Sequence, residues 1–150
     1  MSYKKKHKNK NLRLIRNNKN KGKGYSVKRG ILAARFPFVL FSDSDLATPI
    51  QEVGKLMNFM KKGYDIVIGS RNLKNSNVII KQPYYRQLMG KALALIVNLI
   101  GLTGFKDTQC GFKLFKKNAA KQIVKLQTID HYAFDVEVLL IAQKLGFRIK

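Results

Sequence analysis

The sequence predicts an α/β fold in which a mostly parallel sheet is flanked by helices. Three observations support this prediction: short apolar runs alternate with amphipathic stretches of helical length, 45% of the residues are hydrophobic, and no internal repeat is evident. Buried parallel strands are typically continuous apolar runs, whereas covering helices show apolar residues at intervals of three and four. Alternation of the two patterns is typical of βαβ architecture.

The first predicted elements lead up to a pair of acidic residues. Leu12–Arg16 is a short strand candidate, and the polar segment 17–24 is expected to be a loop. Apolar residues at helical spacing predict a helix over Tyr25–Arg35. The apolar run Phe38–Phe41 predicts a buried strand, which leads directly into Ser42-Asp43-Ser44-Asp45.

The middle of the chain predicts a helix and a strand, followed by a loop and a long helix. The first helix starts at Thr48-Pro49 and ends at Gly63, because proline favours a first turn and glycine a C-terminus. The apolar residues of Asp65–Ile68 predict a buried strand. A polar loop is expected over Asn72–Gln82, and Pro83 is expected to open a helix that reaches about Leu102.

The last third of the chain predicts four further elements. A strand is expected within Asp107–Phe115, and a short helix over Asn118–Lys125. The apolar pattern of Phe134–Leu145 predicts an amphipathic helix that ends at Gly146, and Phe147–Ile149 would begin a new strand.

Positive charge is concentrated near the N-terminus. The chain has 30 Lys+Arg against 8 Asp+Glu, for a formal net charge of +22. Residues 1–42 contain 13 of these basic residues and no acid, and we expect residues 1–11 to be a basic disordered tail. Such a charge attracts an anionic membrane or a nucleic acid, and charge alone does not choose between them. The single cysteine excludes an intramolecular disulfide framework.

Two carboxylates follow the predicted strand that ends at Phe41. Asp43 and Asp45 lie at its C-terminal end, the edge at which open α/β sheets bind ligands. Hard oxygen ligands of this kind suit Mg²⁺ or Mn²⁺, and such an ion can bridge a diphosphate. The alternative is a pair of acids favoured only by the following helix N-terminus.

Basic residues lie at the same predicted edge of the sheet. The motif Lys21-Gly22-Lys23-Gly24 precedes a helix, where glycine lets the backbone approach a phosphate and lysine adds charge. The alternative for this motif is a flexible basic turn. Arg71 follows the strand at 65–68, and Arg86 lies near the start of the long helix. Their guanidinium groups suit phosphate oxygens, although ordinary surface arginines are the alternative.

Six motifs between Asn20 and Arg148 occur in a telling order: NKGKGYSVKRGILAA, FSDSDLATP, YDIVIGSRN, QPYYRQLMG, DTQCGFKLF and HYAFDVEVLLIAQKLGFRI. Over this range the chain resembles an inverting family 2 glycosyltransferase of the GT-A fold. Within that family it is similar to the enzymes that transfer glucose to dolichyl phosphate. The resemblance implies that residues 12–150 form a partial domain of this family. Relatives begin with a strand and an acidic loop that have no counterpart before Leu12, so we expect a fragment that is truncated at both ends.

The resemblance also implies roles for individual residues. The catalytic residues would be Asp43, Asp45 and Asp135, of which Asp43 and Asp45 would bind the metal. Nucleotide and phosphate binding would involve Lys21, Gly22, Lys23, Gly24, Asp43 and Arg71. The acceptor would be bound by Arg71, Arg86, Asp107, Gln109 and Gly111. Asp135 and Glu137 lie on the last helix, where acids often help to order the site, and the alternative for both is an ordinary pair of acids near a helix start.

The implied reaction is transfer of a hexose to a polyprenyl or dolichyl phosphate with inversion. The donor would be UDP-glucose, which supplies the glucose, and the cofactor would be Mg²⁺ or Mn²⁺. Nucleic acid would not be a partner. The enzyme would be cytoplasmic and peripheral at the cytosolic face of a membrane. The apolar segment Ala92–Ile100 is either a buried core helix or a membrane-surface helix that receives the lipid. A basic nucleic-acid-binding module and an inactive remnant of the transferase are the alternative functions.

Overall fold

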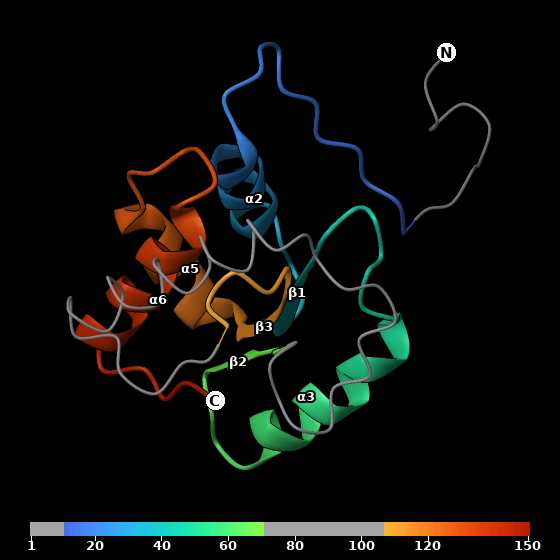
Figure 1. Cartoon of the computed structure of the whole chain (residues 1–150), viewed down its shortest axis with the longest axis vertical. Helices are drawn as coiled ribbons and strands as arrows, with labels where there is room; N and C mark the ends of the chain where they lie inside the picture. The colour runs from blue at the N-terminus through green and yellow to red at the C-terminus, as the bar shows by residue number, and fades with distance from the viewer. Residues whose placement is uncertain (1–10, 71–106) are drawn as a thin grey trace, which may run out of the picture.

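A three-stranded sheet forms the central layer of the structure (Figure 1). The computed structural model describes residues 11–70 and 107–150. The strands are β1 (Phe38–Ser42), β2 (Ile66–Ile68) and β3 (Phe112–Lys116), in the spatial order β1-β3-β2. Each forms where the sequence places a short apolar run, and the predicted α/β class is confirmed.

The direction of β3 differs from the mostly parallel sheet that the sequence predicts. Leu114 of β3 lies opposite Leu40 of β1 and Val67 of β2, and both pairings are antiparallel. β1 and β2 therefore run in the same direction, with β3 inserted between them. At the outer edge of β2, Ile66 forms a parallel bridge with Ile149, so the strand expected near the C-terminus is present as a single bridge.

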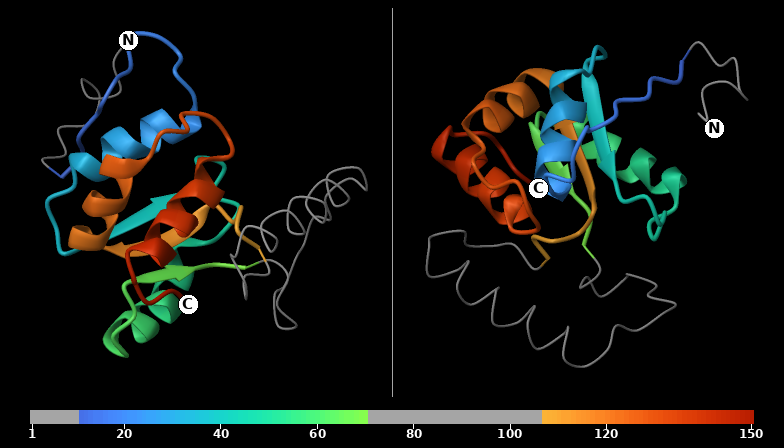
Figure 2. Two further views of the ribbon diagram at one scale, coloured as in Figure 1. Left: turned by 90° about the vertical axis from the view of Figure 1, so that its left-hand side faces the viewer. Right: turned by 90° about the horizontal axis from the view of Figure 1, so that it is seen from above.

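Helices cover both faces of the sheet (Figure 2). One face carries α2 (Lys23–Leu32), α5 (Lys117–Leu126) and α6 (Phe134–Lys144). The other face carries the short 3₁₀-helix η1 (Ile50–Glu52) and α3 (Val53–Lys61). All of these lie where the helical patterns predict them, with ends shifted by a few residues.

The sheet divides the hydrophobic core into two parts. The part beneath α2, α5 and α6 includes Ile31, Ile66, Phe115, Ile123 and Phe134. The part beneath α3 includes Leu56, Met60, Val67, Phe112 and Leu114. Side chains alternate between the faces of a strand, so Lys113 shares the face of Phe115 and enters the larger part of the core. This placement becomes important at the candidate site.

The prediction of a strand over Leu12–Arg16 is wrong. These residues have no regular secondary structure, and no strand in the described ranges pairs with them. A strand needs a neighbouring strand as hydrogen-bonding partner, so an apolar run without such a partner remains irregular. The side chain of Leu14 is accordingly 58% exposed.

Several predictions fall on residues that the structure does not describe: most of the basic tail, the loop at 72–82, the helix at 83–102, Arg71 and Arg86. Within the described ranges, every helix is too short or too polar to cross a membrane.

Candidate active site at the end of strand β1

Asp43 is held against the central strand at the point where β1 ends. Its backbone N–H donates a hydrogen bond of 2.9 Å to the carbonyl of Gly111, which extends the pairing of β1 and β3 beyond Ser42. Gly111 also lies directly beneath the Asp43 carboxylate. A Cβ atom at Gly111 would be 1.8 Å from Oδ2 and 2.1 Å from Cγ of Asp43. The Asp43 carboxylate can therefore occupy this position only because residue 111 has no side chain.

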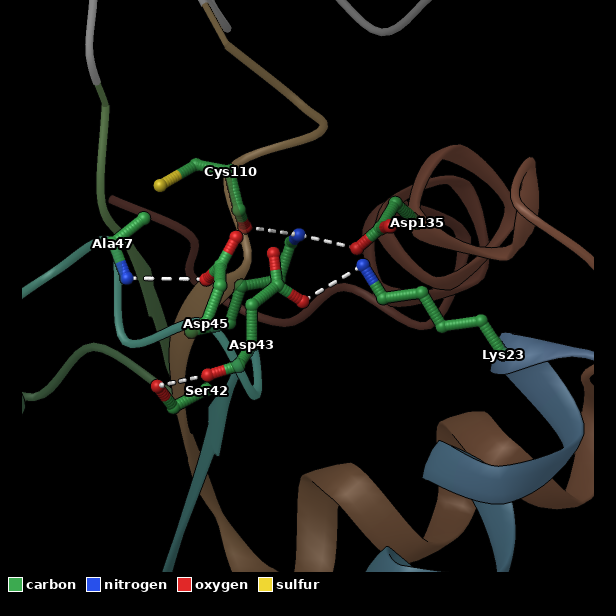
Figure 3. A network of polar contacts seen from close by, with 8 residues as sticks. Lys23, Ser42, Asp43, Asp45, Ala47, Cys110 and Asp135 are labelled. Atoms are coloured by element: carbon green, nitrogen blue, oxygen red, sulfur yellow. Dashed lines mark hydrogen bonds and ion pairs between the residues drawn. The ribbon is translucent and has the colours of Figure 1, made fainter. Parts of the chain in front are cut away.

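Lys23 approaches the same carboxylate from the start of α2 (Figure 3). Its Nζ lies 2.8 Å from Oδ1 of Asp43, and about a third of each side chain is exposed (30% and 32%). The ammonium group also lies 5.4 Å from the ring centre of Phe41 and 6.0 Å from that of Phe134. The resemblance implies that Lys23 lies near the nucleotide phosphates, which stays a prediction, and the structure pairs Lys23 with Asp43.

Two glycines fix the start of α2 against another loop of the chain. Gly22 has φ 99°, and a Cβ there would lie 2.3 Å from the carbonyl oxygen of Asp130. A Cβ at Gly24 would lie 2.7 Å from the carbonyl oxygen of Ile129. The N–H of Tyr25 donates a hydrogen bond of 3.1 Å to the carbonyl oxygen of Asp130. The space that these glycines leave is filled by the chain itself, and their phosphate-binding role stays a prediction.

The loop that follows Asp43 is held in an uncommon conformation. Leu46 has φ 52°, a region that residues with a side chain seldom occupy, and its N–H donates to the Asp43 carbonyl at 3.2 Å. Oδ1 of Asp45 accepts a hydrogen bond of 3.1 Å from the N–H of Ala47 (Figure 3). Asp43 and Asp45 thus belong to one tightly turned loop, and their joint action stays a prediction. No local pattern in the sequence indicates the strain at Leu46.

A buried ion pair lies beside this loop, between Lys113 of β3 and Asp135 of α6. Its side chains are only 1% and 4% exposed, and Nζ of Lys113 also donates to the Cys110 carbonyl at 2.6 Å. Burial raises the pKa of the Asp135 carboxyl, although the charges of Lys113 and Lys23 act to lower that pKa. No sequence motif singled out Lys113. The available signal was a lysine between phenylalanine and leucine in the strand expected within Asp107–Phe115.

Glu137 orders the loop on which α2 rests. Its Oε1 accepts hydrogen bonds from the N–H and hydroxyl of Thr128, at 2.8 and 2.6 Å, and its Oε2 accepts one of 2.8 Å from the N–H of Ile129. Glu137 therefore acts one step away from the carboxylates, through the backbone that positions Lys23.

The other predicted residues are distributed more widely. Lys21 lies over the ring of Tyr25, with its Nζ 4.8 Å from the ring centre. It lines a pocket of about 340 Å³ with residues that include Arg16 and Arg29. Asp107 is buried, whereas Gln109 is exposed. The structure therefore brings together Lys23, Asp43, Asp45, Gly111 and Asp135.

The donor set suits a hard divalent cation. Asp43 and Asp45 offer carboxylate oxygens, the ligands that Mg²⁺ and Mn²⁺ prefer. In the ranges that the structure describes, no group of three or more His, Cys, Asp and Glu side chains could hold a metal. Mg²⁺ commonly takes only one or two protein carboxylates, with waters and substrate phosphates as its remaining ligands. The two aspartates fit this pattern.

Comparison with known proteins places the chain among sugar transferases. A family profile described as Glycosyl transferase family 2 matches residues 2–124. A dolichyl-phosphate beta-glucosyltransferase of Dictyostelium discoideum is 39% identical over 153 residues, covering 99% of this chain and 47% of the relative. Proteins of the same name from Trichomonas vaginalis and Homo sapiens are 36% and 34% identical over 132 and 131 residues. They cover 85% and 81% of this chain, and 40% and 39% of those relatives.

The chain thus spans less than half the length of these curated relatives. The family profile nevertheless covers most of the chain, from the basic N-terminus into α5. The resemblance noted in the sequence motifs is confirmed, and the chain belongs to glycosyl transferase family 2.

Proposed function

We propose that this chain contributes to the transfer of glucose from UDP-glucose to dolichyl phosphate, with inversion at the anomeric carbon. The names of its relatives support this class of reaction. The observation that carries the proposal is the position of the Asp43 carboxylate. It lies at the end of β1, fixed between Gly111 and Lys23, with Asp45 on the same loop.

Asp43 and Asp45 are the proposed ligands of Mg²⁺ or Mn²⁺. A divalent cation bound there would offset the negative charge that develops on the departing nucleoside diphosphate. Lys23 adds a positive charge at the same place, where it can contact the donor phosphates. These three side chains together would orient the diphosphate for departure.

The acceptor places little chemical demand on the protein. A lipid phosphate is an oxyanion near neutral pH, so it can attack without a strong general base. Positioning then supplies most of the catalysis. Asp135 suits a positioning task, because its carboxylate is buried and tied to Lys113. We propose that the acceptor side is formed by Asp107, Gln109 and Gly111, together with Arg71 and Arg86.

The proposed acceptor is a membrane lipid, so the chain would work as a peripheral protein at the cytosolic face of a membrane. Its formal net charge of +22 supports this proposal, since basic residues are attracted to anionic headgroups.

Two assays test the proposed function. The first measures transfer of radiolabelled glucose from UDP-glucose to vesicles that contain dolichyl phosphate, with and without Mg²⁺. The second measures UDP-glucose binding to the chain by calorimetry in the presence of Mn²⁺. The double variant Asp43→Asn, Asp45→Asn should abolish both signals. Glu52→Gln is a matched control, because Glu52 is an acid that pairs with Lys55 on the opposite face of the sheet. Unchanged UDP-glucose binding in the double variant would refute the assigned site.

A further inference from the structure

We propose that Lys23 is an exchangeable counter-ion that occupies the cation position on Asp43 and is released to the donor diphosphate when a metal binds. This inference rests on the proposed function, which supplies the metal and the diphosphate. It adds an order of events: Lys23 is held back from phosphate until the cation is in place.

The ion pair uses the atom that a cation would need. Nζ of Lys23 lies 2.8 Å from Oδ1 of Asp43, while Gly111 lies against the Oδ2 side of the same carboxylate. A metal ligated by Asp43 would therefore approach through the region that the ammonium group fills. Two positive charges at one carboxylate also repel each other, so binding of the second weakens the hold on the first.

The exposure of the pair makes exchange feasible. Both side chains are about one-third exposed, and ion pairs of this kind contribute little to stability. The neighbouring pair of Lys113 and Asp135 differs, because its side chains are almost fully buried. The ammonium group of Lys113 also donates a hydrogen bond to the Cys110 carbonyl in addition to its ion pair with Asp135. One lysine at the site is thus fixed, and the other can move.

Two aromatic rings beside Lys23 offer its ammonium group favourable contacts when it leaves Asp43. The backbone at the start of α2 is anchored by the close approach of Gly22 and Gly24 to the loop at 129–131, so only the side chain needs to rotate. The ring faces of Phe41 and Phe134 already lie 5.4 and 6.0 Å from Nζ, and aromatic faces attract ammonium groups.

The test measures Mn²⁺ binding by electron paramagnetic resonance, first with Mn²⁺ alone and then with Mn²⁺ and UDP. Lys23→Met keeps the apolar stem of the side chain and removes its charge. Lys55→Met is the matched control: it removes the same charge from another exposed ion pair, that of Lys55 with Glu52 on the opposite face of the sheet. With Mn²⁺ alone, Lys23→Met should bind the ion about fivefold more tightly than wild type, and Lys55→Met should differ by less than about twofold.

With Mn²⁺ present, Lys23→Met should bind UDP more weakly than wild type, because the released ammonium is missing. Opposite effects on metal and nucleotide are the signature of exchange, since a general loss of structure would weaken both. If Mn²⁺ binds to wild type but Lys23→Met binds it no more tightly than Lys55→Met, the exchange is refuted and the metal site stands. If none of the three proteins binds Mn²⁺ with or without UDP, the metal assignment itself is wrong and the exchange fails with it.

Discussion

Replacing Gly111 with alanine tests whether the position of the Asp43 carboxylate controls ligand binding. A Cβ at 111 would lie 1.8 Å from Oδ2 of Asp43, and real Cβ contacts below 3.0 Å are essentially never found. The carboxylate must therefore move by about 1.2 Å or more. Since Asp43 is 32% exposed, it can turn toward solvent instead of disrupting the core.

The expected effects on binding and on stability differ sharply. A misplacement of about 1 Å in a positioning group can lower catalytic efficiency about 100-fold, and we expect a loss of that order in Mn²⁺-dependent UDP-glucose affinity. Stability should fall by no more than about 1 kcal/mol, because only an exposed ion pair with Lys23 is lost. Calorimetry measures the affinity, and urea unfolding followed by circular dichroism measures the stability.

Gly30→Ala provides the control. A Cβ at Gly30 meets nothing within 4 Å, and Gly30 lies inside α2, so alanine should stabilise the helix by about 0.5–1 kcal/mol and leave affinity unchanged. Combining Gly111→Ala with Asp43→Asn should add no further loss of affinity, because both act through one carboxylate. The reasoning fails if Gly111→Ala folds normally and binds UDP-glucose within about threefold of wild type.

Three further predictions concern charged side chains, two beside the site and one at the other end of the sheet. Lys113→Met should lower the free energy of unfolding by about 3–5 kcal/mol in urea titrations, because it leaves Asp135 buried without its partner, and adding Asp135→Leu should restore most of the loss. Glu137→Gln should cost about 1 kcal/mol in the same assay through weaker hydrogen bonds to the loop at 128–129, and a change below the measurement error would contradict its ordering role. Burial acts to raise the pKa of Asp65, but the pKa is lowered overall. Hydrogen bonds from the Lys116 side chain and the Arg148 backbone N–H lower it, and so do the positive charges of these two residues. The ionised form of Asp65 therefore stabilises the fold above the unfolded pKa of about 3.9, and this contribution disappears as pH falls through the lower folded pKa. The stability difference between wild type and Asp65→Asn should accordingly shrink in acid unfolding curves below about pH 4, and a constant difference would refute the assignment.

Much of the fold could be predicted because local patterns determine where elements begin and end. The run Phe38–Phe41 becomes β1, and the glycines expected to end two helices, Gly63 and Gly146, have φ 91° and 75°. Strand direction and strand partners are not local properties. An apolar run does not specify its neighbours, which is why the antiparallel β3 and the unpaired Leu12–Arg16 could not be anticipated.

The candidate site shows the same division between local and distant information. Asp43 and Asp45 could be predicted, because their position depends only on the strand that precedes them. The contacts of Gly22 and Gly111 could not, because the atoms they approach belong to Asp130 and Asp43, distant in the sequence. A glycine near a charged residue suggests room for a ligand, but the same room can receive the chain's own backbone or side chain.

The balance of charge at the site favours joint binding of the proposed metal and the proposed diphosphate. Lys23 pairs with Asp43, Lys113 pairs with Asp135, and Asp45 lies on the same loop as Asp43, so these five groups carry one negative charge when all are ionised. A divalent cation alone would reverse that charge, and a diphosphate alone would add to the negative charge beside two aspartates. Bound as a pair, they leave the local charge close to its starting value. The buried Lys113 stays fixed throughout, so Lys23 is the charge of these five that can follow the phosphate.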